Sequence, residues 1–534
     1  MGKYDLLIRG GAVLDGSGSK PVITDIGVVD DRIAAMGDLS KSEASKILNV
    51  DKMHIAPGFI DMHTHSDISA LFHPEQESMI SQGVTTQVVG NCALCIGMAT
   101  DAEPYIFEKR WLGLQGIKIT WKSLEQNLQR ITDNGIATNY LTLAGQGTLR
   151  KGVMGQEDRP PDREEMNKMK AALEAALEQG AWGISTGLEY TPSSYADVNE
   201  LAELSSVVGK YGGFYASHLR NEGDFLEDSV SEAIEIGERA GIPIQLSHHK
   251  AEGRRNWGKV HKTLHMVDMA RARGVDVQMD QYPYDAFQTG LSVQLLPPWV
   301  VSGTNQDMIS RLEDHGIRKE IIEEIRANHS DWNDTGENSV WDSMEIANAT
   351  DSDLHGRSIG ELARARGEDP LEYALNLIAG EKNFISAINH AIGEQDIVTV
   401  LQHPMTMIGS DAVGSAAHGK ISETHVHPRC YGTFTRILGL YVRERAVLQE
   451  AEAVRKMTTL PADRLGIKDR GRLIVGNYAD IVVYNPKTVR DNATYAKPHA
   501  YSTGIEWTIV NGRIVWGDST FAGKLPGKVL KRAR

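Results

Sequence analysis

The chain has 534 residues, of which 41% are hydrophobic and 24% charged, and its formal net charge is −15. This composition is that of a globular protein large enough for two substantial cores, and it excludes a disordered chain. An acidic surface repels phosphate backbones, so we expect no nucleic acid among the partners. Three cysteines are too few for a disulfide framework.

Targeting and membrane signals are missing from the sequence. The first residues lack the apolar core of a secretory signal, and no apolar run is long enough to span a bilayer. We therefore expect a soluble, cytoplasmic protein without a membrane partner. The oligomeric state is left open, and a homo-oligomer is compatible with the sequence.

Both ends of the chain show the short apolar runs and turn residues of β-strands. Residues 4–9 are followed by a glycine pair, and 480–484 form a similar run near the other end. Two β-rich ends around one large middle predict a small β-sandwich made from both termini. We place its parts at 1–54 and 466–534, with unrelated terminal caps as the alternative.

The middle of the chain, 55–465, alternates short apolar runs with helical patterns, which is typical of parallel βα units. Eight such units predict an α/β fold of the (β/α)8 TIM-barrel type, with its chemistry at the carboxyl ends of the strands. The eight runs lie at 58–63, 85–89, 139–144, 183–186, 213–217, 243–247, 275–280 and 405–409.

The last two of these runs are about 125 residues apart, far beyond a normal connection. We expect an inserted subdomain there, at about 286–350, before the last barrel strand. It is either a lid over the barrel mouth or a decoration away from the site.

The strongest local signal is the segment 58–65, which ends in His63, Thr64 and His65. Alternate side chains of a strand share one face, so the two imidazoles point the same way. Two histidines at the end of an apolar strand form half of a divalent metal site. Two solvent-facing histidines are the alternative.

Three other runs deliver possible ligands to the same rim, namely Cys92, His218 and His248. One cysteine and two histidines with an open position for water are typical of a catalytic zinc site. Taken alone, Cys92 would be interpreted as a buried packing residue. Because other strands also end in possible metal ligands, we favour a ligand role for Cys92. Asp411 follows the eighth run, where it is either a proton acceptor beside the metal or a helix cap.

In combination these motifs resemble the N-acyl-D-amino-acid deacylases of the amidohydrolase superfamily. The resemblance rests on His63-Thr64-His65, 90–92, 217–220, 246–250, 280–284 and 409–411, and it extends over essentially the whole chain. It implies a metal-dependent barrel with a β-sandwich and zinc-dependent hydrolysis of N-acyl-D-amino acids as small-molecule substrates.

The resemblance also implies roles for individual residues. One tightly bound zinc ion is expected at Cys92, His218 and His248. A weaker metal site is expected at His63 and His65, with help from Cys92 and Asp411. Asp411 would accept a proton from water and donate it to the leaving amine. Lys250, Tyr282, Tyr190 and Arg429 are the expected partners of the substrate carboxylate.

Two other functions remain as alternatives. A cyclic-amide hydrolase such as a dihydroorotase or hydantoinase would use a carboxylated lysine on the fourth strand, but the run 181–187 contains no lysine. A non-catalytic barrel scaffold would be expected to lose metal ligands, whereas every expected ligand is present here.

Overall fold

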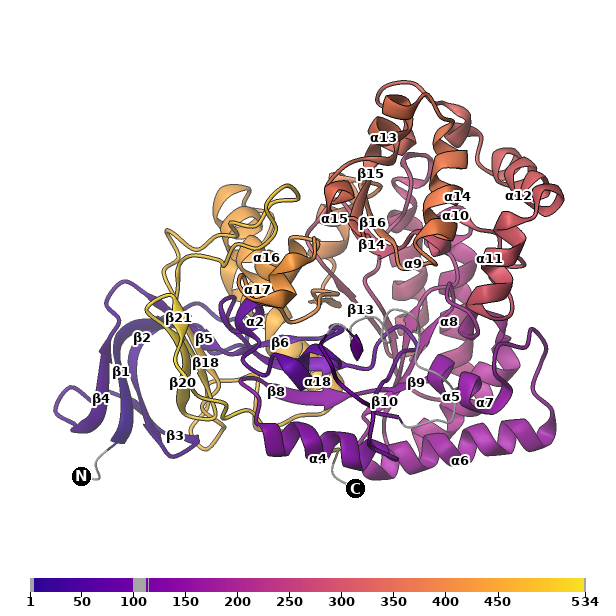
Figure 1. Ribbon diagram of the computed structural model, residues 1–534. Helices are drawn as coiled ribbons and strands as arrows, with labels where there is room; N and C mark the ends of the chain where they lie inside the picture. Colours follow the sequence, from indigo (N-terminus) through magenta and orange to yellow (C-terminus); the bar gives the residue numbers. More distant parts are fainter. Residues whose placement is uncertain (1–3, 99–111, 114, 533–534) are drawn as a thin grey trace.

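The computed structural model describes residues 4–98, 112–113 and 115–532. Its ribbon shows a β-domain beside a barrel, with a further group of helices above the barrel (Figure 1). None of the described helices combines the length and apolar character needed to cross a bilayer.

Strands from both ends of the chain form one nine-stranded sheet, which confirms the predicted terminal β-domain. Strand β5 pairs with β1 from its own end and with β18 from the opposite end, so the two termini meet inside the sheet rather than forming separate caps. Its strands are β1 (Tyr4–Val13), β2 (Val22–Val29), β3 (Arg32–Gly37), β4 (Ala44–Asn49), β5 (His54–Pro57), β18 (Ile481–Tyr484), β19 (Ile505–Val510), β20 (Arg513–Gly517) and β21 (Thr520–Phe521).

The predicted parallel barrel is also confirmed. Its strands form two runs, β17-β13-β12-β11-β10-β9 and β6-β7-β8. Residue 143 joins β8 to β9, and the amide of Met62 donates to the carbonyl of Ile408 at 3.4 Å, so the ring closes. The strands are β6 (Phe59–Asp61), β7 (Val84–Val89), β8 (Asn139–Thr142), β9 (Ala144–Gly145), β10 (Gly183–Gly187), β11 (Phe214–His218), β12 (Ile244–Leu246), β13 (Val277–Gln281) and β17 (Thr406–Ile408).

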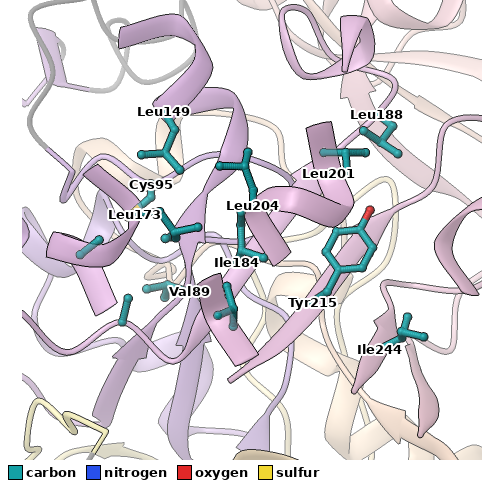
Figure 2. Packing of buried hydrophobic residues seen from close by; sticks show 14 of the residues in the cluster. Val89, Cys95, Leu149, Leu173, Ile184, Leu188, Leu201, Leu204, Tyr215 and Ile244 are labelled. Atoms are coloured by element: carbon teal, nitrogen blue, oxygen red, sulfur yellow. The ribbon is translucent and has the colours of Figure 1, made fainter. Parts of the chain in front are cut away.

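Helices cover the outside of the barrel because the strands present apolar side chains on that face. Figure 2 shows Val89, Ile184 and Tyr215 of the strands facing Leu149, Leu173 and Leu204 of the helices. The helices are α1 (Ser69–Phe72), α2 (Glu77–Ile80), α4 (Leu124–Asn134), α5 (Gln146–Met154), α6 (Arg163–Gln179), α7 (Val198–Gly209), α8 (Leu226–Ala240), α9 (Lys259–Ala272), α15 (Glu394–Gln402), α16 (Arg429–Arg436), the π-helix Ile437–Glu444, α17 (Glu450–Met457) and α18 (Thr459–Leu465).

Between β13 and β17 the chain leaves the barrel and forms the predicted insertion, which carries its own hydrophobic core around Trp341, Ile346 and Leu375. A three-stranded antiparallel sheet joins it to the barrel mouth. The region 286–350 supplies two of these strands, and the third comes later in the chain. The elements are β14 (Phe287–Gly290), α10 (Leu291–Leu295), α11 (Asn305–Glu313), α12 (His315–Asn328), β15 (Met344–Asn348), α13 (Ile359–Arg366), α14 (Pro370–Gly380) and β16 (Ser386–Asn389).

Candidate metal centre and active site

The predicted ligands lie together where the barrel strands end. His63 follows β6, Cys92 follows β7, His218 ends β11 and His248 follows β12. The backbone φ angles of Cys92, His248 and Asp411 are 51°, 36° and 51°. Residues with a side chain rarely adopt positive φ because of steric strain, and such strain is typical of functional sites.

The donor atoms of Cys92, His218 and His248 form a compact buried group. Sγ of Cys92 lies 3.7 Å from Nδ1 of His218 and 3.7 Å from Nε2 of His248. The two nitrogens are 2.9 Å apart. One ion can therefore contact all three atoms, which come from three different strand ends.

A neighbouring group shares the cysteine. Nε2 of His63 lies 3.3 Å from Sγ of Cys92 and 3.5 Å from Oδ1 of Asp411. Nε2 of His65 lies 3.1 Å from the same carboxylate oxygen. The structure thus brings together all six residues that the sequence predicted as ligands.

The protonation of this group fits a soft divalent cation. Burial lowers the pKa of His218 to about 4 and also lowers that of His248, so both imidazoles are neutral and able to donate a lone pair. Burial raises the pKa of the Cys92 thiol, so a thiolate there requires a compensating cation. One sulfur and two nitrogen donors are the ligands that zinc prefers.

Each buried histidine of the centre also has a carboxylate at its other ring nitrogen. Such a partner fixes the ring orientation and directs the opposite nitrogen toward a metal. The pairs are His63 with Asp280 (3.4 Å), His218 with Glu189 (3.1 Å) and His248 with Glu222 (3.2 Å).

The sequence pattern gave no role to these three carboxylates. Asp280 lies in β13 and Glu189 just after β10, so an acidic residue at the end of a buried strand was an available signal. Glu222 lies four residues beyond the end of β11, where the sequence offers no such signal.

Lys250 and Arg429 are both buried close to Tyr282. Nζ of Lys250 is 5.9 Å from the centre of the tyrosine ring, and Cζ of Arg429 is 4.8 Å from it. Within the described part of the chain, the Tyr282 hydroxyl has no hydrogen-bond partner. Two cations and a free hydroxyl form a suitable setting for a carboxylate.

Both cations already have carboxylate partners, which the sequence did not predict. Lys250 donates to Glu222, and Nη1 of Arg429 lies 2.8 Å from Oδ2 of Asp411. Burial by itself would lower the pKa of Lys250, but the nearby carboxylates, Glu222 foremost, raise it. For Asp411 the two effects have the opposite sign. Burial by itself would raise the pKa of this carboxyl, but Arg429 and the neighbouring histidines hold it well below its usual value.

Tyr190 links the centre to the insertion. The centre of its ring lies 4.8 Å from that of His218, and its hydroxyl is 3.2 Å from Oγ1 of Thr289 in β14. His249, which follows His248 in the chain, points away from the centre, with Nε2 2.8 Å from Oγ1 of Thr263. Neighbouring side chains point in opposite directions along an extended chain, so His248 can face the centre while His249 does not.

A cavity of about 2530 Å³ lies between the barrel rim and the insertion. It is lined on one side by Cys92, His248 and Asp411 and on the other by insertion residues such as Thr289 and Met344. The insertion therefore borders the site, as a lid would, and is not a remote decoration.

Comparison with known proteins places this geometry in a family. Residues 49–516 match the protein family described as "Amidohydrolase family". N-acyl-D-glutamate deacylase of Alcaligenes xylosoxydans xylosoxydans is 36% identical over 99% of this chain and 97% of the relative. The chain therefore belongs to the amidohydrolase family, and within it to the N-acyl-D-amino-acid deacylases.

Solved structures agree with this assignment. N-acyl-D-glutamate deacylase from Bordetella bronchiseptica, in complex with zinc and a phosphonate mimic of the tetrahedral intermediate, superposes with a TM-score of 0.83 at 32% identity, covering all of both chains. D-aminoacylase, a protein with a binuclear metal centre, gives 0.82 at 32% identity, covering 99% of this chain and 100% of its own.

Proposed function

We propose that this protein hydrolyses the amide bond of N-acyl-D-amino acids, releasing a carboxylate and a free D-amino acid. The observation that carries the proposal is the convergence of Cys92, His218 and His248 within 3.7 Å of one another, with Asp411 at the same rim. This is a donor set for zinc next to a carboxylate able to transfer protons.

Cys92, His218 and His248 would hold the principal zinc ion, and His63 and His65 would support a weaker site with Cys92 and Asp411. When bound, zinc supplies a Lewis acid that lowers the pKa of water and polarises the amide carbonyl. The paired carboxylates Asp280, Glu189 and Glu222 keep the imidazoles in the orientation that binding requires.

Asp411 would move the proton. Its low pKa keeps it ionised and ready to accept a proton from the attacking water, and the same carboxyl then protonates the departing nitrogen. Arg429, 2.8 Å away, holds this carboxylate in place.

The substrate carboxylate would bind between Lys250 and Arg429, with the Tyr282 hydroxyl as a further donor and Tyr190 packing alongside. The two cations lie 5.9 Å and 4.8 Å from the centre of the Tyr282 ring, which supports this placement. Glu222 and Asp411 keep the cations positioned before the substrate arrives.

The test is amine release from paired N-acetyl-D- and N-acetyl-L-amino acids, with zinc-loaded protein. We expect release from D members and little from their L partners. Silence across the panel, with zinc content verified, would overturn the proposal and favour a cyclic amide, which the same protein should then be offered.

A further inference from the structure

The insertion presents one wall of the cavity directly beside the substrate-binding residues. We define this insertion wall as β14, β15 and β16 with the segment 291–310. Thr289 lies 3.2 Å from the Tyr190 hydroxyl, and the Phe287 ring lies 6.0 Å from Nζ of Lys250. A D-amino acid held by Lys250 therefore has this wall within reach of its side chain.

The insertion wall carries no permanent positive charge. Neither lysine nor arginine occurs in 274–310, in 327–356 or in 383–419. Its cavity-lining side chains include amides, hydroxyls and apolar groups, such as Phe287, Gln288, Thr289, Val293, Met344 and Asn348, and one carboxylate, Asp307.

Two histidines in these segments also line the cavity, and neither supplies a free cation. Burial lowers the pKa of His329, which stacks on Trp332 at 4.1 Å between ring centres. His390 lies 3.4 Å from the carboxylate of Glu345, so any positive charge on it is already balanced.

Lysine and arginine elsewhere around the cavity lie outside the insertion wall, and two of them, Lys151 of α5 and Arg254 after β12, line the cavity on the barrel side. Lys382 precedes β16, whose Ser386 pairs with Gly290 at the end of the sheet opposite Phe287. On the barrel side, Arg220 pairs with Glu232 and Arg255 with Asp224.

The two buried cations at the centre, Lys250 and Arg429, also have carboxylate partners. Lys250 is paired with Glu222 and Arg429 with Asp411. The α-carboxylate of the substrate would have to share them, which leaves neither of these two cations for a second carboxylate. A buried carboxylate without a cation loses its hydration without compensation.

We propose that this protein selects N-acyl-D-amino acids with uncharged side chains over those with acidic side chains. This inference rests on the proposed deacylase function and names its substrate class. The insertion wall sets the preference, because it can pack against or hydrogen-bond a neutral side chain but cannot neutralise a negative one.

The decisive test uses isosteric pairs. N-acetyl-D-glutamine is compared with N-acetyl-D-glutamate, and N-acetyl-D-asparagine with N-acetyl-D-aspartate, by kcat/KM at pH 7.5. We expect the amide to exceed the acid by about tenfold or more in each pair. An acid that is hydrolysed as fast as its amide would overturn this inference while leaving the deacylase function intact. No turnover of any D substrate would overturn both.

A pair of variants tests whether the wall is the cause. Val293 of α10 lines the cavity and is half-buried, so Val293→Lys can add a cation with little disturbance of the core. Val293→Gln is the neutral control of similar length. We expect Val293→Lys to shift the acid-to-amide ratio at least about threefold toward the acid relative to the control. An equal ratio in both variants would show that the wall charge does not set the preference.

Discussion

The metal centre and the insertion wall line the same cavity, but they differ in their content of charged groups. The centre contains many buried ionisable groups. His63, His218 and His248 each lie next to a carboxylate, and the cations Lys250 and Arg429 each pair with a carboxylate as well. The wall contains regular antiparallel strands without lysine or arginine and rests on its own apolar core. The difference suggests that the barrel supplies the chemistry, whereas a separately stabilised insertion selects the side chain.

The largest effect is expected at the centre, from Asp411→Asn. Because the amide cannot accept a proton, kcat should fall by about 100- to 10,000-fold. Zinc should remain, since Cys92, His218 and His248 are intact, and metal analysis together with steady-state kinetics checks both points. Asp268→Asn, at an exposed site on α9, is the control and should leave kcat unchanged. Loss of zinc along with activity would make Asp411 a principal ligand instead.

The independence of the insertion can be tested by emptying its core. Trp341 is fully buried, and its indole donates to the carbonyl of Trp332 at 2.9 Å. Trp341→Ala should destabilise the insertion by about 3–5 kcal/mol. Thermal unfolding and limited proteolysis measure this, and zinc content should not change.

The control for this experiment is Trp299→Ala, because Trp299 is 39% exposed. It should change stability much less. A proportionate loss of zinc from Trp341→Ala would show instead that the wall and the centre form one cooperative unit.

A smaller effect is expected from Glu222→Gln. Glu222 contacts Nδ1 of His248 at 3.2 Å and pairs with Lys250, so it links a proposed zinc ligand to a proposed partner of the substrate carboxylate. Loss of its charge should weaken zinc binding about 10- to 100-fold in a chelator competition and should alter KM. Glu232→Gln, which removes the partner of Arg220 instead, should leave zinc affinity unchanged. An unchanged zinc affinity in Glu222→Gln would show that Glu222 acts only as the partner of Lys250 and does not support His248.

The smallest effect concerns Cys430, a buried thiol outside the proposed ligand set. Burial raises its pKa from 9.0 to about 11. Because the folded state keeps a proton that the unfolded thiol has lost, this residue stabilises the fold fully below pH 9, and the contribution is lost as pH rises toward 11. Urea unfolding at pH 8 and pH 10.5 should therefore show a smaller loss of stability in Cys430→Ala than in the wild type. An equal loss in both proteins would contradict the raised pKa.

Much of the fold follows from local sequence pattern. Short apolar runs separated by helical periodicity predicted all eight barrel strands, and the unusual gap before the last run predicted the insertion. The common position of the proposed ligands, such as His63 and His248, could be predicted because a residue that ends a parallel barrel strand must lie at the common rim.

The pairing of charges was not predictable in this way. Glu222 meets His248 and Lys250 from 26 and 28 residues away, and Arg429 meets Asp411 across a loop. No periodicity specifies which carboxylate lies nearest to which cation, since that depends on how separate loops pack above the barrel. The likeness to known deacylases pointed to these residues but not to their partners.

The sequence by itself determined the architecture and the set of chemical groups, because strand alternation and helical spacing are local properties of the chain. Only the tertiary structure decided how those groups are used. It paired both buried cations of the centre with carboxylates, oriented three imidazoles with acidic partners, and placed a sheet of three strands without lysine or arginine beside the metal centre. These are distances between segments far apart in the chain, and they exist only once the barrel has closed.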